Sequence, residues 1–250
     1  MKKTFTLGAF FLITYLGFLI ATMPATFLLG QVKLPQNITL IGVQGTVWHT
    51  QIEQITYDKS SIAKVDASLS FWSLFTLTPK LNIHFGDPFI SGPEGNLVLT
   101  VSSQKAEVTE LNVLIKANEI AQQLTLPLPV SAQGNVEISI TKLAINLQNK
   151  NACLAGDGDI TWSKAGVIAL DQKIKLGKFN ADIACEKDDF ALTLSPKNNL
   201  GLTFTAYIHS NGRISGNGFL QPNAKFPQQL KSALSFLGKK DSRGRYWLSF

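Results

Sequence analysis

The chain has 250 residues, of which 45% are hydrophobic and 16% are charged, and its formal net charge is +6. The positive charges are spread thinly, without a basic stripe interleaved with aromatic residues, so we expect no nucleic-acid partner. Val, Ile, Thr, Leu and Phe are abundant and are punctuated at short intervals by Gly, Asn, Ser and Asp, which indicates an all-β protein.

Residues 5–29 form one uncharged, mostly apolar run that follows Lys2 and Lys3. One helix of this length can span a hydrocarbon core of ~30 Å, and the two lysines favour a cytoplasmic start. The sequence therefore predicts a transmembrane anchor over residues 1–30, with residues 31–250 exported as a β-rich domain. We assign the anchor to the apolar residues Phe5, Phe11, Leu12, Leu16, Leu19 and Ile20.

A cleaved secretory signal is the alternative for this segment. Signal cores usually run ~7–15 residues and end at a small-x-small cleavage site. Here the run is longer, and Met23 and Pro24 stand where small residues are required. The anchor is the preferred interpretation, and both interpretations export the rest of the chain.

After a short tether, most of the chain alternates between apolar and polar residues, as strands do. Val136, Ile138 and Ile140 follow this pattern, and the apolar phase then shifts by one, which predicts a β-bulge near residues 141–142. One apolar and one polar face are typical of an antiparallel sheet covered on one side. Further alternating segments lie at residues 97–101, 111–115, 179–183 and 200–208.

Three other segments complete the predicted elements. Residues 69–77 are apolar on both faces, which predicts either a central strand buried on both sides or a segment near the membrane surface. Short helices are expected at residues 118–124, with Asn118 as cap, and at residues 227–237. Residues 245–250 read as a last strand.

A weak internal repeat suggests that the exported domain divides into two similar sheet units. In both halves a glycine opens a strand that carries a tryptophan, as in Gly45 and Trp48 and again in Gly158 and Trp162. The subdivision is expected near Gly134.

Cys153 and Cys185 are the two cysteines of the chain. An isolated pair in an exported domain predicts one structural disulfide. Closing a loop of about 30 residues with a disulfide stabilises a fold by roughly 3–4 kcal/mol. The spacing is not C-x-x-C, so we expect no redox-active site.

The sequence offers no catalytic constellation. His49, His84 and His209 lie far apart and have no acidic residue or cysteine at metal-ligand spacing. Residues 156–159 lack the further ligands of a calcium loop and read as a tight turn, and residues 188–189 read as a solvated turn. We therefore expect no enzymatic activity, no metal, no cofactor and no small-molecule substrate.

Several segments, taken in order, give the chain a resemblance to protein N of the bacterial type II secretion system. They are the anchor with Pro24, residues 43–48, 69–72, 156–165 and 176–177, both cysteines, and residues 237–238 and 244–246. The motif residues that we single out are Gly45, Trp48, Trp72, Gly158, Trp162, Gly244 and Tyr246. In one departure, the family's first motif has a glycine soon after the tryptophan, whereas His49 follows here.

The resemblance implies a single-pass inner-membrane protein with a cytoplasmic N-terminus and a periplasmic, curved and twisted antiparallel sheet. It would be a non-catalytic scaffold or interaction subunit, with membrane lipid and other secretion components as partners. The strand rhythm also loosely resembles AsmA-like proteins, which suggests lipid handling in a groove as the alternative. That groove would be lined by residues such as Phe71, Phe75, Leu97 and Leu99. An exported hydrolase with a scattered site is the third hypothesis.

Overall fold

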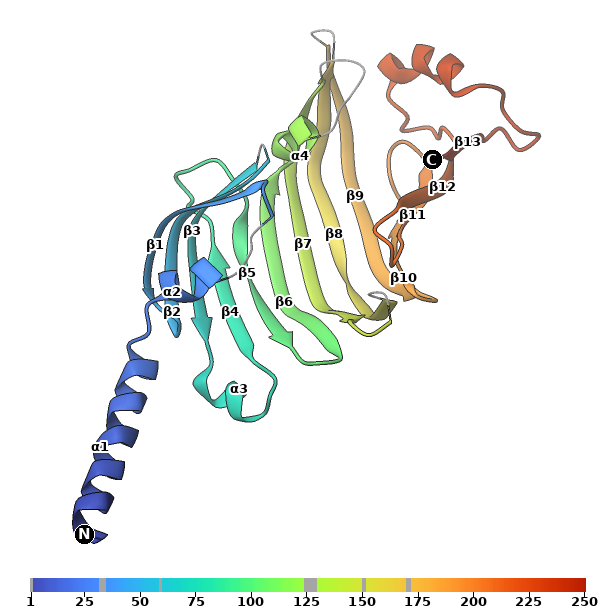
Figure 1. Cartoon of the computed structure of the whole chain (residues 1–250). Helices are drawn as coiled ribbons and strands as arrows, with labels where there is room; N and C mark the ends of the chain where they lie inside the picture. The colour runs from blue at the N-terminus through green and yellow to red at the C-terminus, as the bar shows by residue number, and fades with distance from the viewer. Residues whose placement is uncertain (1, 32–34, 59, 124–129, 150–151, 170–171) are drawn as a thin grey trace.

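The computed structural model describes residues 2–31, 35–58, 60–123, 130–149, 152–169 and 172–250. Thirteen strands form one antiparallel sheet in which each strand pairs with the next along the chain. Figure 1 shows this meander as a single curved layer. The strands are β1 (Ile38–Thr46), β2 (His49–Tyr57), β3 (Ser60–Leu69), β4 (Lys80–Phe85), β5 (Glu94–Val101), β6 (Lys105–Lys116), β7 (Val130–Asn146), β8 (Ala152–Ala169), β9 (Gln172–Glu186), β10 (Asp189–Leu194), β11 (Leu202–Ile208), β12 (Ile214–Leu220) and β13 (Tyr246–Ser249).

The helices are short apart from the first. They are α1 (Lys2–Ala21), α2 (Ala25–Gln31), α3 (Phe71–Phe75), α4 (Ala117–Gln123) and the 3₁₀ segments η1 (Gln228–Leu230) and η2 (Ser232–Leu237). The apolar run at the start is therefore divided between two helices rather than forming one. The break falls at Pro24, because proline cannot continue the hydrogen bonding of a helix interior. Pro24 forms an isolated bridge with Thr46 instead.

Helix α1 projects away from the sheet (Figure 1), and its apolar side chains are open to the surroundings. The exposed fractions of Phe10, Phe11 and Ile13 are 70%, 73% and 70%. Leu12, Leu16, Leu19 and Ile20 are exposed as well, whereas the side chain of Phe5 lies outside the described residues. Within the described residues, no helix is both long enough and apolar enough to cross a membrane.

The alternating segments become strands as predicted. They lie in β5, β6, β7, β9 and β11, and the last predicted strand is β13. The pairing of β7 with β8 shifts between Ile140 and Lys142, which confirms the β-bulge predicted from the change of apolar phase. Gly134 lies inside β7, where the same ladder shifts again between Gln133 and Asn135. The sheet continues without a break on both sides of it.

Two local predictions are wrong. Residues 69–77 are not a buried strand: β3 ends at Leu69, and α3 follows with no buried residue. Residues 156–159 are not a turn but lie inside β8. Glycine is required at Gly158, because an added Cβ would lie 2.7 Å from the carbonyl oxygen of Ser139 on the neighbouring strand.

The two predicted helices exist with different details. Helix α4 begins at Ala117, so Asn118 lies inside it rather than capping it, and Leu124 lies outside the described residues. The predicted helix over residues 227–237 is two 3₁₀ segments, η1 and η2.

The core is concentrated in the second half of the sheet. One cluster of buried side chains comprises Ala165, Ile174, Leu176 and Phe179, and a second comprises Leu220, Phe226 and Tyr246. Leu230 of η1 packs against both clusters. The C-terminal segment therefore joins β8 and β9 to the last strands of the sheet.

The predicted disulfide between Cys153 and Cys185 is present, with 5.8 Å between the two Cα atoms. It lies at the start of β8 and the end of β9, at the open end of this long hairpin. The bond therefore ties the two strands together where they are farthest from their connecting turn.

Candidate functional site

The strand register gathers the apolar residues of β6 to β11 on one face of the sheet, because residues paired across antiparallel strands point to the same face. One row runs through Val113, Ile138, Ile160, Ala181, Leu194 and Phe204. A second row runs through Ile115, Val136, Trp162 and Phe179. We call this surface the apolar face; it continues on β5 at Leu99, which pairs with Leu81 and Val108.

The apolar face is covered only in part. Leu230 and Leu234 of the C-terminal segment pack over residues of its second half. Figure 1 shows the described part of the chain as a single layer of strands between β3 and β8, with only the short helix α4 against the ends of β6 and β7. A cavity of about 370 Å³ remains on this face, lined by Val136, Ile160, Trp162, Leu176, Phe179, Asn180, Ala181, Leu194, Leu200 and Leu202. An apolar surface of this kind is a candidate binding site.

Trp162, one of the family-motif residues, shapes this cavity. Its ring stacks on Phe179 with 5.5 Å between the ring centroids, and its indole Nε1–H donates a hydrogen bond to the carbonyl oxygen of Gln133 at 2.8 Å. The β8–β9 ladder shifts between Trp162 and Ala165. Because bulges increase local twist and bending, we expect β8 and β9 to bend at Trp162.

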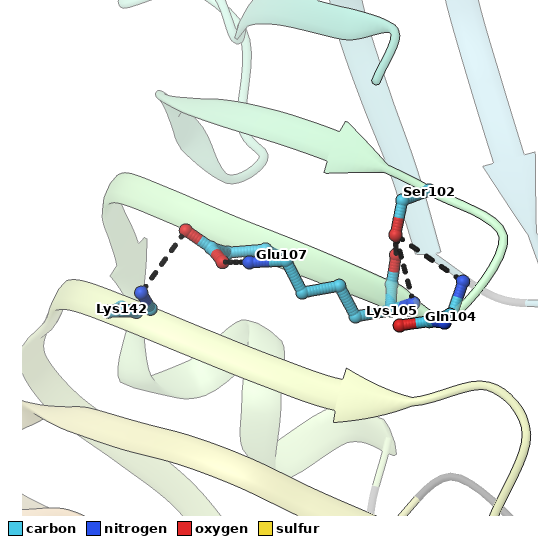
Figure 2. Close-up of polar contacts among 5 residues, drawn as sticks. All are labelled: Ser102, Gln104, Lys105, Glu107 and Lys142. Atoms are coloured by element: carbon cyan, nitrogen blue, oxygen red, sulfur yellow. Dashed lines mark hydrogen bonds and ion pairs between the residues drawn. The ribbon is translucent and has the colours of Figure 1, made fainter. Parts of the chain in front are cut away.

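The opposite face is polar and is held by ion pairs, as Figure 2 shows for Glu107. Glu107 Oε2 accepts a hydrogen bond from Lys105 Nζ at 2.7 Å, and Lys142 Nζ lies 3.4 Å from Glu107 Oε1. The hydrogen bond from Lys105 lowers the pKa of Glu107, with a further contribution from Lys142. Since Lys142 borders the bulge of β7, these ion pairs link the bulge to β6.

Two other carboxyl groups also have a lowered pKa. A hydrogen bond from Lys64 lowers the pKa of Asp87, and the backbone N–H of Arg245 lowers that of Asp241. The guanidinium of Arg245 also binds Asp241 at 2.8 Å and lies over the rings of Phe219 and Trp247. The positive charge of Arg245 is therefore paired within the fold.

We expect acid to destabilise the protein through these carboxylates. Their folded-state pKa values lie below the ordinary 3.8 of Asp and 4.5 of Glu, so their stabilisation is present at neutral pH and is lost as the pH falls through the lowered values. The urea midpoint should hold from about pH 7 to about pH 5 and fall towards about pH 3. A Glu107→Gln chain should show a shallower fall, and an unchanged fall would exclude a contribution from Glu107.

A second set of motif residues lies where α1 meets the sheet. The indole Nε1–H of Trp48 donates to the carbonyl oxygen of Ile20 at 2.9 Å, and the backbone N–H of Val47 donates to that of Met23 at 3.0 Å. These bonds satisfy carbonyl groups at the C-terminal end of the helix, which have no partner inside it. Gly45 has φ of 87°, and an added Cβ would clash with the carbonyl oxygen of His49.

The remaining motif residues are spread over the molecule. Trp72 lies on α3 and is 76% exposed. Gly244, with φ of 76°, closes the turn before β13, and Tyr246 is buried in the second core cluster. The structure therefore does not bring the motif residues together in one site.

The structure assembles a polar chain that the sequence analysis missed. His209 Nδ1 lies 2.7 Å from Asp189 Oδ2, and His209 Nε2 lies 2.8 Å from Ser215 Oγ. This order of groups is that of a Ser-His-Asp triad. However, the N–H of Gly216, next to Ser215, is bonded to the carbonyl oxygen of Phe250 at 3.1 Å, so it offers no oxyanion-hole donor. The contacts of His209 with Asp189 and Ser215 tie the β11–β12 hairpin to β10.

The other histidines also pair within the sheet. His49 Nε2 lies 3.8 Å from Asp66 Oδ1, and His84 stands opposite Asp66 in the β3–β4 register. Across the described residues, no group of three or more His, Cys, Asp or Glu side chains is arranged to hold a metal ion.

Comparisons with known proteins give one consistent result. Residues 36–249 match the family described as type II secretion system (T2SS), protein N. The type II secretion system protein N of Aeromonas hydrophila is 27% identical over 252 residues, covering 100% of this chain and 98% of the relative. The protein of the same name from Vibrio cholerae is 24% identical, covering 98% and 97%, and that from Klebsiella pneumoniae is 26% identical, covering 98% and 94%. No solved structure gives a significant match.

Proposed function

Because this chain belongs to the family of type II secretion system protein N, we propose that it is an accessory, non-catalytic component of that system, which exports folded proteins across the outer membrane. The observation that carries the proposal is the family match over residues 36–249, a range that includes the whole thirteen-stranded sheet. On this proposal the sheet acts as a scaffold that binds other secretion components.

We place the N-terminal segment, residues 1–30, in the inner membrane as an anchor, with the sheet in the periplasm. The support for this placement is the uncharged run over residues 5–29 after two lysines and the exposed apolar side chains of α1. A helix that is apolar all round requires an apolar environment. The chain's continuation through Pro24 into α2 would then mark the exit from the bilayer.

The apolar face is the proposed contact surface for a partner. Its rows of apolar side chains are incompletely covered, and burying apolar surface is worth ~25 cal/mol per Å². A contact there would add the missing layer to a single-layer sheet. The polar face, with the ion pairs of Glu107, would stay in solvent.

The test is photo-crosslinking in intact cells from position 138, with position 139 as the matched control. Ile138 belongs to the apolar face and Ser139 is exposed on the opposite face of the same strand. A photo-crosslinking residue at 138 should join the chain to another secretion component, and one at 139 should do so far less. Equal yields from both positions would contradict the assignment of the face.

Lipid handling is a second candidate, favoured by the cavity of about 370 Å³ on the apolar face. The four residues that the sequence suggested for the lipid groove do not lie on one surface. Leu97 and Leu99 lie on β5, whereas Phe71 and Phe75 lie on α3, outside the sheet. The same crosslinking experiment separates the two functions. Lipid handling predicts that the product from position 138 carries a phospholipid instead of a protein.

A further inference from the structure

Helix α3 and the residues after it form an apolar projection from the sheet. Trp72, Phe75 and Leu77 are 76%, 70% and 82% exposed. The segment between Asp66 and Lys80 contains no charged residue. Exposed apolar groups concentrated in this way mark a site of contact with a membrane or another molecule.

The projection satisfies its own backbone with the polar side chains that it contains. The hydroxyl of Ser73 donates to the carbonyl oxygen of Ser70 at 2.5 Å and accepts from the N–H of Lys80 at 2.9 Å. The N–H of Ser70 donates to the carbonyl oxygen of Lys80 at 2.9 Å, which closes the loop. Thr76 Oγ1 donates to the carbonyl oxygen of Ser73 at 2.9 Å. Polar groups therefore hold the loop from within while the apolar side chains point outward, which is the arrangement that contact with lipid requires.

The projection lies beside the end of α1. Figure 1 shows both elements extending beyond the same ends of the strands. The rings of Trp48 and Phe71 are 5.2 Å apart, and Trp48 is bonded to Ile20 of α1. A cavity of about 410 Å³ between them is lined by Gly17, Ile20, Ala21, Trp48, Leu69 and Phe71. The aromatic side chains of α3 (Phe71, Trp72 and Phe75) therefore lie at the level of the last turns of α1.

We propose that the projection formed by α3 and the residues after it inserts Trp72, Phe75 and Leu77 into the surface of the phospholipid bilayer that the N-terminal anchor enters. The inference rests on the proposed anchor and adds a second attachment to it. Tryptophan favours the membrane–water interface, where its ring contacts lipid and its N–H meets polar groups. Insertion of these side chains would hold the sheet to the membrane at a second point, in addition to the hydrogen bonds that join the end of α1 to the sheet at Val47 and Trp48.

The experiment labels single cysteines of the full-length chain with an environment-sensitive fluorophore. The native cysteines are joined in a disulfide, so a new thiol is labelled selectively. The positions are Phe75→Cys on α3, Phe11→Cys on α1 as a report on the anchor, and Phe89→Cys as the matched control. Phe89 is 96% exposed and lies at the other end of β4 from α3. Trp72→Cys repeats the α3 measurement at a second exposed position.

The labelled chains are reconstituted into vesicles of phosphatidylethanolamine and phosphatidylglycerol that contain a lipid with a nitroxide near its headgroup. The label at 75 should shift to the blue and lose fluorescence to the quencher, and the label at 89 should do neither. A quenched label at 11 with an unquenched label at 75 and 72 would overturn the inference and leave the anchor standing. An unquenched label at 11 with a quenched label at 75 would show that α3 enters the bilayer without the anchor, which would overturn the anchor and the part of the inference that rests on it.

If a protein partner rather than phospholipid contacts α3, we expect a different result. In that case the labels at 75 and 72 stay unquenched in vesicles and become shielded only in membranes that contain the assembled secretion system. This outcome would contradict insertion into the bilayer, because a phospholipid surface would then not be sufficient to bury α3.

Discussion

Replacing Phe179 with alanine should lower the free energy of unfolding by about 3–5 kcal/mol, because this removes a large ring from a packed cluster and leaves a cavity. Phe179 is 7% exposed and packs in the core cluster that contains Ile174 and Leu176. Its ring also stacks on Trp162. In a domain of this size the expected fall in melting temperature is roughly 10 °C. Thermal unfolding of the purified chain measures it.

Lys178→Ala is the matched control for Phe179→Ala. Lys178 precedes Phe179 on β9 and is exposed, so its truncation should change stability by no more than about 0.5 kcal/mol. Equal melting temperatures for the two variants would mean that the ring of Phe179 is not packed as described. The apolar face would then lack the rigid packing that a specific contact surface needs.

Loss of the disulfide should have an effect of similar size. Cys153 and Cys185 are 32 residues apart, and removing a crosslink over such a loop costs about 3–4 kcal/mol, chiefly because the unfolded chain regains conformational freedom. The double variant Cys153→Ser/Cys185→Ser should therefore melt roughly 10 °C below the parent chain.

A reducing agent gives the internal control. It should lower the melting temperature of the parent chain towards that of the double serine variant and leave the variant unchanged. A parent chain that melts at the same temperature with and without reductant would show that the crosslink contributes nothing to the fold, contrary to the expectation for an exported domain.

Much of the sheet could be predicted because its strands are buried on one face. Alternation identifies such a strand directly, and a change of its phase revealed the bulge beside Lys142. Alternation could not identify the structure of residues 69–77, because an all-apolar segment has no period that distinguishes a strand from a helix. Residues 156–159 were misread as a turn because their glycines serve close strand packing, as at Gly158, rather than chain reversal.

The candidate sites depended on distances that the sequence does not contain. The apolar face arises from the register of separate strands, which sets Ile138 beside Ile160 and Ile160 beside Ala181. The contact of Asp189 with His209 joins positions 20 residues apart, one at the start of β10 and one just after the end of β11. The cysteine pair was accessible because two cysteines leave a single intramolecular pairing.

Identifying what crosslinks to position 138 in secreting cells is the most direct way to establish whether this sheet is a contact surface for the secretion system. We expect a covalent adduct with another type II secretion component, at a higher yield than from position 139. Adducts only with proteins outside the secretion system, or no protein adduct from either position, would contradict this role of the sheet.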